Sequence, residues 1–204
     1  MKPITLADIQ NLHEYELARP EFRQLVIDLK KRRRVALGRL MTLVFENRDT
    51  VRFQIQEMLR VERIVRPDKV QEEIDVYNEL LPGPGEVAAT LFIEVTDPAE
   101  VQPTLDRFIG LDEPGRLVLK VGDRACPALF APGQSREDRI SAVHYIRFSL
   151  GEEGRKALDS NAPAVLAVDH GGYRAERVLG PETVEELRKD LGADERPPAA
   201  ETRG

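Results

Sequence analysis

Apolar residues recur with helical spacing in three stretches of the first part of the chain. We expect helices at about 20–34, 50–64 and 68–81. The first should begin at Pro20, because proline is favoured at the first position of a helix. Between the first two helices, the stretch 35–47 is rich in β-branched and aromatic residues around a Gly-Arg pair, which predicts a β-hairpin.

The hydrophobic period changes after the sequence PGPG, residues 82–85, which is the best candidate for a boundary. Beyond it, apolar and polar residues alternate as they do in β-strands, and short helical patterns separate these stretches. The expected strands are 86–95, 116–121, 124–130, 142–150, 162–170 and 173–179. The expected helices are a short one around Pro103, then 151–160 and 181–191.

Two further features of this second part bear on its topology. Pro127 lies within an expected strand and argues for an edge position, because proline cannot donate a hydrogen bond to a neighbouring strand. The order strand, helix, strand, strand also occurs twice, at an offset of roughly 50 residues. We infer a possible pseudo-repeat that builds a mostly antiparallel sheet with helices on one face.

The predicted fold class is therefore α+β. A mainly helical segment with one hairpin covers residues 1–81, and a sheet segment covers 86–191. A chain of 204 residues is enough for one good core, so we expect the two segments to form one compact unit. The polar, proline-rich stretch 192–204 is expected to be a flexible tail.

Composition restricts the function. The hydrophobic content of 41% and the charged content of 32% are typical of a soluble protein with a packed core. No stretch approaches ~20 apolar residues and the N-terminus does not resemble a signal peptide, so we expect a cytoplasmic protein without a membrane partner. The single cysteine, Cys126, excludes an internal disulfide and a cysteine-rich metal or iron–sulfur site. Any redox centre must then belong to a partner.

Common catalytic and nucleotide-binding motifs are missing from the sequence. It contains neither GxxxxGK[ST] nor GxGxxG, which excludes nucleotide binding through those motifs. It also lacks GxSxG, HExxH and CxxC, the signatures of common hydrolases, zinc proteases and thiol redox sites. We therefore favour a protein without catalytic activity over an enzyme.

Two histidines are candidates for metal binding. His144 shares an expected strand face with apolar residues, and His170 ends a strand just before a Gly-Gly turn. With a carboxylate such as Glu57, they would form a site for iron or zinc. The alternative, which we favour, is a core histidine and a turn residue, because two histidines fall below the usual three protein ligands of a catalytic metal. Otherwise no cofactor is expected.

Five consecutive cations occupy residues 30–34 in a chain whose formal net charge is −6. They could contact the phosphates of a nucleic acid, but no aromatic residue interleaves them to stack on bases. They also lie at the end of the first expected helix, where cations are favoured by the negative pole of the helix dipole. Nucleic-acid binding is therefore the less favoured interpretation.

The second expected helix is rich in planar hydrogen-bonding side chains. Such groups are suited to binding the carboxylates of a partner protein. The candidates for partner binding are Arg48, Arg52, Gln54, Gln56, Arg60 and Arg63. The alternative is an internal network in which the arginines pair with Glu46, Glu57 and Glu62 at helical spacings. The sequence favours neither.

Several stretches together resemble the bacterial domain-of-unknown-function family 3501. They are KKRRRVALG, FENRDTVRFQIQEMLRVERI, DVYNELLP, SAVHYIRF and VDHGGYR, and the resemblance extends from Pro3 to about Leu191. The family has no established activity. Its members are often encoded beside rubrerythrin and an iron–sulfur oxidoreductase of the heterodisulfide-reductase type, which implies a role in defence against peroxide or oxygen.

Three functions are thus compatible with the sequence. The favoured one is a non-catalytic accessory or interaction protein of an oxidative-stress redox system, with rubrerythrin or the iron–sulfur oxidoreductase as the implied partner. The second is a small metal-binding protein or enzyme built on His144 and His170. The third is a nucleic-acid binder that uses residues 30–34.

Overall fold

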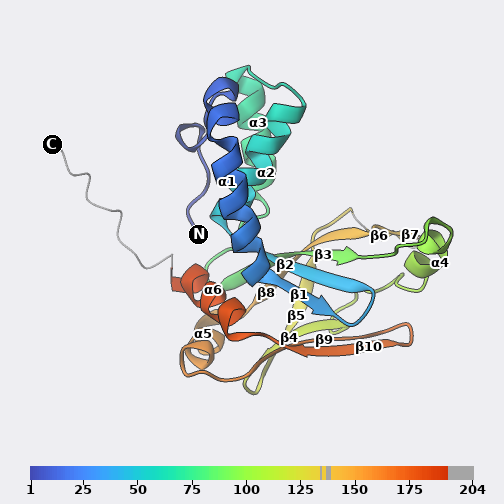
Figure 1. The fold of residues 1–204 in the computed structure, drawn as a ribbon. Helices are drawn as coiled ribbons and strands as arrows, with labels where there is room; N and C mark the ends of the chain where they lie inside the picture. The colour runs from blue at the N-terminus through green and yellow to red at the C-terminus, as the bar shows by residue number, and fades with distance from the viewer. Residues whose placement is uncertain (134, 137–138, 193–204) are drawn as a thin grey trace.

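A computed structural model describes residues 1–133, 135–136 and 139–192. Three helices pack together and stand on a sheet that curves into a barrel-like shape (Figure 1). We call these helices the helical layer: α1 (Leu12–Arg33), α2 (Arg48–Val61) and α3 (Pro67–Asn78), with the short 3₁₀ helix η1 (Leu6–Asp8) beside them. No helix of the described residues is long and apolar enough to cross a membrane.

Helix α1 begins earlier than the sequence pattern predicts. Its N-cap is Asn11, whose side chain accepts a hydrogen bond from the backbone nitrogen of Glu14 at 3.0 Å. Pro20 lies inside the helix rather than at its start, so that prediction was wrong. The turns before Pro20 carry Tyr15 and Arg19, which bind α2, and these tertiary contacts outweigh the hydrogen bond lost at the proline.

The predicted hairpin is confirmed as β1 (Arg34–Leu37) paired antiparallel with β2 (Met41–Glu46). Gly38 in its turn has φ +71°, and a Cβ at this position would stand 2.3 Å from the hydroxyl oxygen of Tyr173. Glycine is therefore required both for the backbone conformation and for the close approach of Tyr173.

Eight strands form one antiparallel sheet in the order β1-β2-β3-β8-β5-β4-β9-β10. The strands that follow the hairpin are β3 (Glu86–Ile93), β4 (Leu117–Val121), β5 (Arg124–Phe130), β8 (Val143–Ser149), β9 (Ala164–His170) and β10 (Tyr173–Val178). A separate two-stranded sheet contains β6 (Ser135–Arg136) and β7 (Arg139–Ile140).

The sheet curves until its first and last strands come near each other. The hydroxyl group of Tyr173 on β10 donates to the carbonyl oxygen of Leu37 at 2.6 Å and accepts from the backbone nitrogen of Leu40 at 3.0 Å. This side chain links the two edges and makes the sheet nearly closed. Alternate residues of the strands point inward and form one large apolar core, to which Leu43, Leu91 and Phe148 belong.

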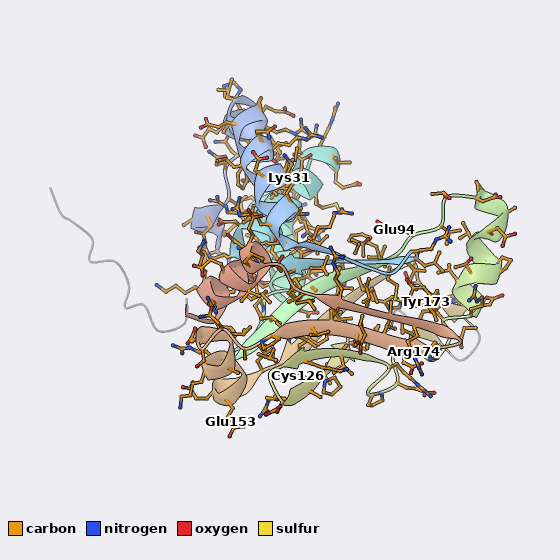
Figure 2. The ribbon with its side chains drawn as sticks, turned by 60° about the horizontal axis from the view of Figure 1, so that its bottom comes forward. Lys31, Glu94, Cys126, Glu153, Tyr173 and Arg174 are labelled. Atoms are coloured by element: carbon orange, nitrogen blue, oxygen red, sulfur yellow. The ribbon has the colours of Figure 1, made fainter. Side chains whose placement is uncertain are left out.

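Helices cover both ends of the barrel, whereas the sequence pattern predicted them on one face. At one end lie η2 (Pro98–Glu100) and α4 (Val101–Asp106), and at the other lie α5 (Gly151–Asp159) and α6 (Pro181–Gly192) (Figure 1). Figure 2 shows the same separation, with Glu153 on α5 at one end and Arg174 of β10 toward the other. Apart from Gly192, the tail expected at 192–204 lies outside the described residues.

The edge position predicted from Pro127 was wrong, because β5 lies between β4 and β8. Residues 124–127 pair with β4, and residues 128–130 pair with β8. Pro127 therefore lies where the strand changes partner, and a missing N–H group is tolerated at such a position.

The pseudo-repeat was also wrong, although the chain order of its elements is as predicted. In the first unit, β5 lies nearer than β4 to the lone strand β3. In the second unit, β9 lies nearer than β10 to the lone strand β8 along the sheet. The strand of the hairpin that lies nearer to the lone strand is thus the second one in the first unit and the first one in the second unit. Because the strand orders differ, the two units are not equivalent. The α+β class itself is confirmed.

Candidate functional site

Glu57 of α2 is the centre of a polar cluster with α1. Its carboxylate accepts hydrogen bonds from the Tyr15 hydroxyl at 2.7 Å and from two guanidinium nitrogens of Arg19 at 2.7 and 2.9 Å. Arg60 adds a longer contact at 3.4 Å. The hydrogen bonds from Arg19 and Tyr15 outweigh burial and lower the pKa of Glu57 to about 2. Burial and the nearby carboxylate raise the pKa of Tyr15.

The other residues predicted to bind a partner mostly make contacts within the protein. Arg48 pairs with Asp8 at 2.6 Å, and the Arg52 guanidinium lies 4.7 Å from the centre of the Phe22 ring. Gln54 donates to Glu46 at 3.2 Å, and the Gln56 side chain bonds both backbone groups of Gln10. Arg63 lies just after α2 with φ 53° and is exposed. A role of these side chains in partner binding stays a prediction.

The internal network was the alternative for these arginines, and its partners differ from those expected. Arg60 pairs with Glu57 at helical spacing, as the sequence predicts. Arg48, however, pairs with Asp8 of η1, and Glu57 is bound mainly by Arg19 of α1, which was not part of the expected network. The hydrogen bonds of Arg48 and Thr5 outweigh burial and lower the pKa of Asp8 to about 2. These contacts fasten η1 and α1 to α2.

The cationic run at the end of α1 is fixed partly by α6. The side chain of Arg33 is fully buried and donates two hydrogen bonds to Asp190, at 2.7 and 2.8 Å, and one to Glu186 at 3.1 Å. Arg32 also donates to Glu186, at 3.2 Å. Burial raises the pKa of Asp190, although Arg33 opposes this effect. In this arrangement Arg33 cannot reach a nucleic-acid phosphate.

The two histidines lie near the α4 end of the barrel and bond to backbone carbonyl groups. His144 is fully buried, and its Nε2 lies 2.8 Å from the carbonyl oxygen of Ser141, while its Nδ1 has no hydrogen-bond partner. Burial lowers the pKa of His144. His170 Nε2 lies 2.8 Å from the carbonyl oxygen of Ile109.

The structure does not join these histidines to Glu57, which is bound by Tyr15 and Arg19 in the helical layer. Across residues 1–133, 135–136 and 139–192, no three His, Cys, Asp or Glu side chains come together in a way that could hold a metal ion. Metal binding by His144 and His170 stays a prediction that metal analysis can test.

A groove of about 600 Å³ lies where α3 meets the outer surface of the barrel, and we call it the α3 groove. One wall is formed by Val76, Glu79 and Leu80 at the end of α3. The opposite side is formed by the end of β5 and the residues after it, 129–132. The floor is the outer face of β3 and β8.

A row of residues across four neighbouring strands runs along the floor of the α3 groove and reaches its β5 side. Glu46 of β2 is the register partner of Ala88 of β3, Ala88 is the partner of Arg147 of β8, and Arg147 is the partner of Leu129 of β5. Side chains opposite one another in a sheet share one face, so this row points away from the barrel core. The Arg147 guanidinium donates a hydrogen bond to the backbone carbonyl oxygen of Glu79. This bond holds the end of α3 beside the row.

Glu46 is the most deeply buried acid of this groove, with 4% of the residue exposed. The Thr90 hydroxyl donates to its carboxylate at 2.6 Å, and the Gln54 amide donates at 3.2 Å. Both donors are neutral, and no Lys or Arg of the described residues forms an ion pair with Glu46. Within the part of the chain that the structure describes, its negative charge therefore has no cationic partner.

Sequence reasoning missed the α3 groove, although two residues carried a signal. Val76 lies off the apolar stripe of its helix and is 62% exposed. Leu129 alternates with the inward-facing Ala128 and is 54% exposed, so an apolar side chain stands on the outer face of β5. Exposed apolar residues that flank a hollow are typical of a binding surface.

In outline, the described residues form a helical layer on a nearly closed antiparallel barrel, with an open groove beside the end of α3. The chain belongs to the family described as "Protein of unknown function (DUF3501)", whose model matches residues 3–191. The resemblance found in the sequence is thereby confirmed.

A solved structure supports the same fold. It is the crystal structure of a novel protein of unknown function from Burkholderia pseudomallei K96243, with 32% sequence identity and a TM-score of 0.87. The match covers 93% of this chain and 100% of that chain. No curated protein matches this chain.

Proposed function

We propose that this protein is a non-catalytic interaction protein that binds another protein through the α3 groove. The observation that carries the proposal is the groove itself, an open hollow of about 600 Å³ with exposed Val76 and Leu129 at its sides. Exposed aliphatic side chains around a concave surface gain free energy when a partner covers them. The histidines and Glu57, by contrast, are engaged in contacts that support the fold.

The proposed partner belongs to a cytoplasmic redox system for defence against peroxide or oxygen. Rubrerythrin and the iron–sulfur oxidoreductase are the candidates, because family members are often encoded beside them. Cys126 is buried in the barrel core, which leaves thiol or cluster chemistry to the partner. In this proposal the protein contributes a binding surface and no redox centre of its own.

An affinity pull-down from peroxide-stressed cells tests the proposed function. The tagged protein should retain rubrerythrin or the iron–sulfur oxidoreductase, and the purified pair should form a complex in sedimentation velocity. The captured material is analysed for metals as well as proteins. Absence of both partners from the pull-down, together with no complex between purified proteins, would contradict the proposal.

A second candidate function is metal binding through His144 and His170, and one observation favours it. The Nδ1 atom of His144 is buried without a partner, so a nitrogen lone pair is free near the α4 end of the barrel. Residues of one segment reach both histidines, because Ile109 bonds His170 and the charge of Asp112 acts on His144. Stoichiometric iron or zinc that is lost on His144→Gln substitution would establish this function, and metal-free wild-type protein would end it.

A further inference from the structure

We infer that the α3 groove receives a segment of a partner protein that presents a lysine or arginine between apolar residues, with Glu46 as the group that the cation approaches. This inference rests on the proposed function and adds the chemistry of the segment that is bound. It follows from the charge of the groove, from the position of Glu46 and from the apolar sides.

The charges that line the α3 groove are mainly negative. Glu46, Glu79 and Glu86 contribute three carboxyl groups, and Arg147 contributes the one guanidinium group of the lining. Arg147 is itself engaged, because it donates to the carbonyl oxygen of Glu79 and lies 4.0 Å from the carboxylate of Glu86. A cationic side chain therefore complements the groove, whereas an acidic one is repelled.

Glu46 favours a cation at one defined position on the floor of the groove, which a cluster of exposed acids would not do. It is almost fully buried, and among the described residues only the neutral groups of Thr90 and Gln54 donate to it. A buried carboxylate without a cationic partner is costly, and a cation delivered from outside would offset that cost. The residue stands in the cross-strand row that forms the floor, beside Ala88, whose small side chain leaves space above the sheet.

The apolar sides of the groove favour a bound segment in which apolar residues flank the cation. Val76 on the α3 side and Leu129 on the β5 side are both more than half exposed. A free amine or metal cation would leave these side chains in water, whereas a peptide segment would cover both sides and the floor. We therefore assign a protein segment, in which apolar residues flank the lysine or arginine, as the occupant.

The first part of the test is an unbiased selection. A phage-displayed library of random dodecapeptides is panned against immobilised wild-type protein, and the selected peptides are synthesised. The expected result is enrichment of peptides with at least one Lys or Arg flanked by aliphatic or aromatic residues. Enrichment of acidic peptides, or recovery of no binding peptide, would overturn the inference.

The second part locates the binding. Leu129→Lys introduces a positive charge into the groove, and Val178→Lys is the matched control, because Val178 is an exposed aliphatic residue on β10, away from the groove. Affinity for the selected peptides should fall at least tenfold in Leu129→Lys and in Glu46→Gln, and should stay within twofold in Val178→Lys. Thermal melts of each variant confirm that it is folded, and equal binding by Leu129→Lys would overturn the assignment.

Two further outcomes would assign the α3 groove to an occupant other than a partner's segment. Displacement of the peptides by spermidine at a similar affinity would assign the groove to free amines, and groove-dependent dimerisation in sedimentation velocity would assign it to a second copy of the chain. The pull-down separates this inference from the proposed function. If Leu129→Lys captures the redox partner as well as wild-type protein does, the role as an interaction protein stands, but the assignment of binding to the α3 groove fails.

Discussion

The helical layer and the barrel are held together by different kinds of contact. The barrel has one large core of aliphatic and aromatic side chains contributed by all its strands. The helical layer has a smaller apolar core, which contains Ile4, Val51, Ile55, Leu59, Ile74 and Leu81. It adds ionic contacts through Glu57 and through Asp8, and its α1 is joined to α6 by the buried Arg33.

This difference explains why the candidate site lies where the two regions meet. A packed barrel core leaves little room for a ligand, and most charged side chains between α1 and α2 are paired within the protein, although the buried Nε atoms of Arg48, Arg52 and Arg60 have no hydrogen-bond partner. The end of α3 rests on the barrel through Arg147, and beside this contact the outer face of the sheet stays open as the α3 groove. The losses of stability caused by substitutions in the two regions should therefore differ in size, in pH dependence and in salt dependence.

Phe148→Ala in the barrel should have the largest effect on stability. The side chain is fully buried in the barrel core, so its removal costs about 4 kcal/mol through lost burial and the cavity left behind. Urea denaturation at pH 7 and pH 5 should give the same loss, because no titrating group is removed. A loss below about 1 kcal/mol would show that the barrel interior is not closely packed.

Arg33→Met should cost about 3 kcal/mol, because it leaves Asp190 and Glu186 buried without their main cation. Urea denaturation measures the loss. The double variant Arg33→Met/Asp190→Leu is the control and should recover most of it, because Glu186 keeps its contact with Arg32. If the double variant is as unstable as the single one, the loss comes from packing of the long side chain and not from the uncompensated charge.

Glu57→Gln should destabilise the protein by about 1–2 kcal/mol at pH 7, because hydrogen bonds to a charged group are lost. The pKa of Glu57 is lowered from 4.5 to about 2 in the folded protein, so its contribution is fully present above pH 4.5 and is lost as the pH falls toward 2. The gap between wild type and variant should therefore narrow from pH 5 to pH 3. Glu62→Gln, at an exposed position after α2, is the control. A gap that stays constant with pH would contradict the role given to the charge.

Arg174→Ala on the barrel surface should have the smallest effect, below about 0.5 kcal/mol. Arg174 pairs with Asp169 at 2.6 Å, but the two side chains are 78% and 63% exposed. Comparison with Arg33→Met separates the effect of an exposed arginine–aspartate pair from that of a buried one. A loss above about 1 kcal/mol in thermal denaturation would mean that β10 depends on this surface pair.

Local patterns predicted the elements better than their arrangement. The hairpin around Gly38 and the helices α2 and α3 follow from short stretches of sequence, and the structure confirms them. Pro20 and Pro127 were both misinterpreted. Pro20 was judged by the preference of proline for the first position of a helix, and Pro127 by the hydrogen bond that it cannot donate. The contacts of Tyr15 with α2 and the change of partner in β5 determine what is tolerated.

The candidate site depends on strand order, which a single sequence does not show. Glu46, Ala88, Leu129 and Arg147 are far apart in the chain and form one row only because β2, β3, β8 and β5 are neighbours. Val76 was visible as an apolar residue off its helical stripe. The neutral surroundings of Glu46 among the described residues could be recognised only from the positions of Thr90 and Gln54.

Hydrogen–deuterium exchange, measured on the protein alone and in complex with a protein captured in the pull-down, shows whether the α3 groove is the binding site. We expect slower amide exchange on binding at the end of α3, residues 76–80, and at residues 128–132, with little change in α1. Protection confined to the arginine-bearing helix α2 and to α1, with unchanged exchange around the α3 groove, would contradict this expectation.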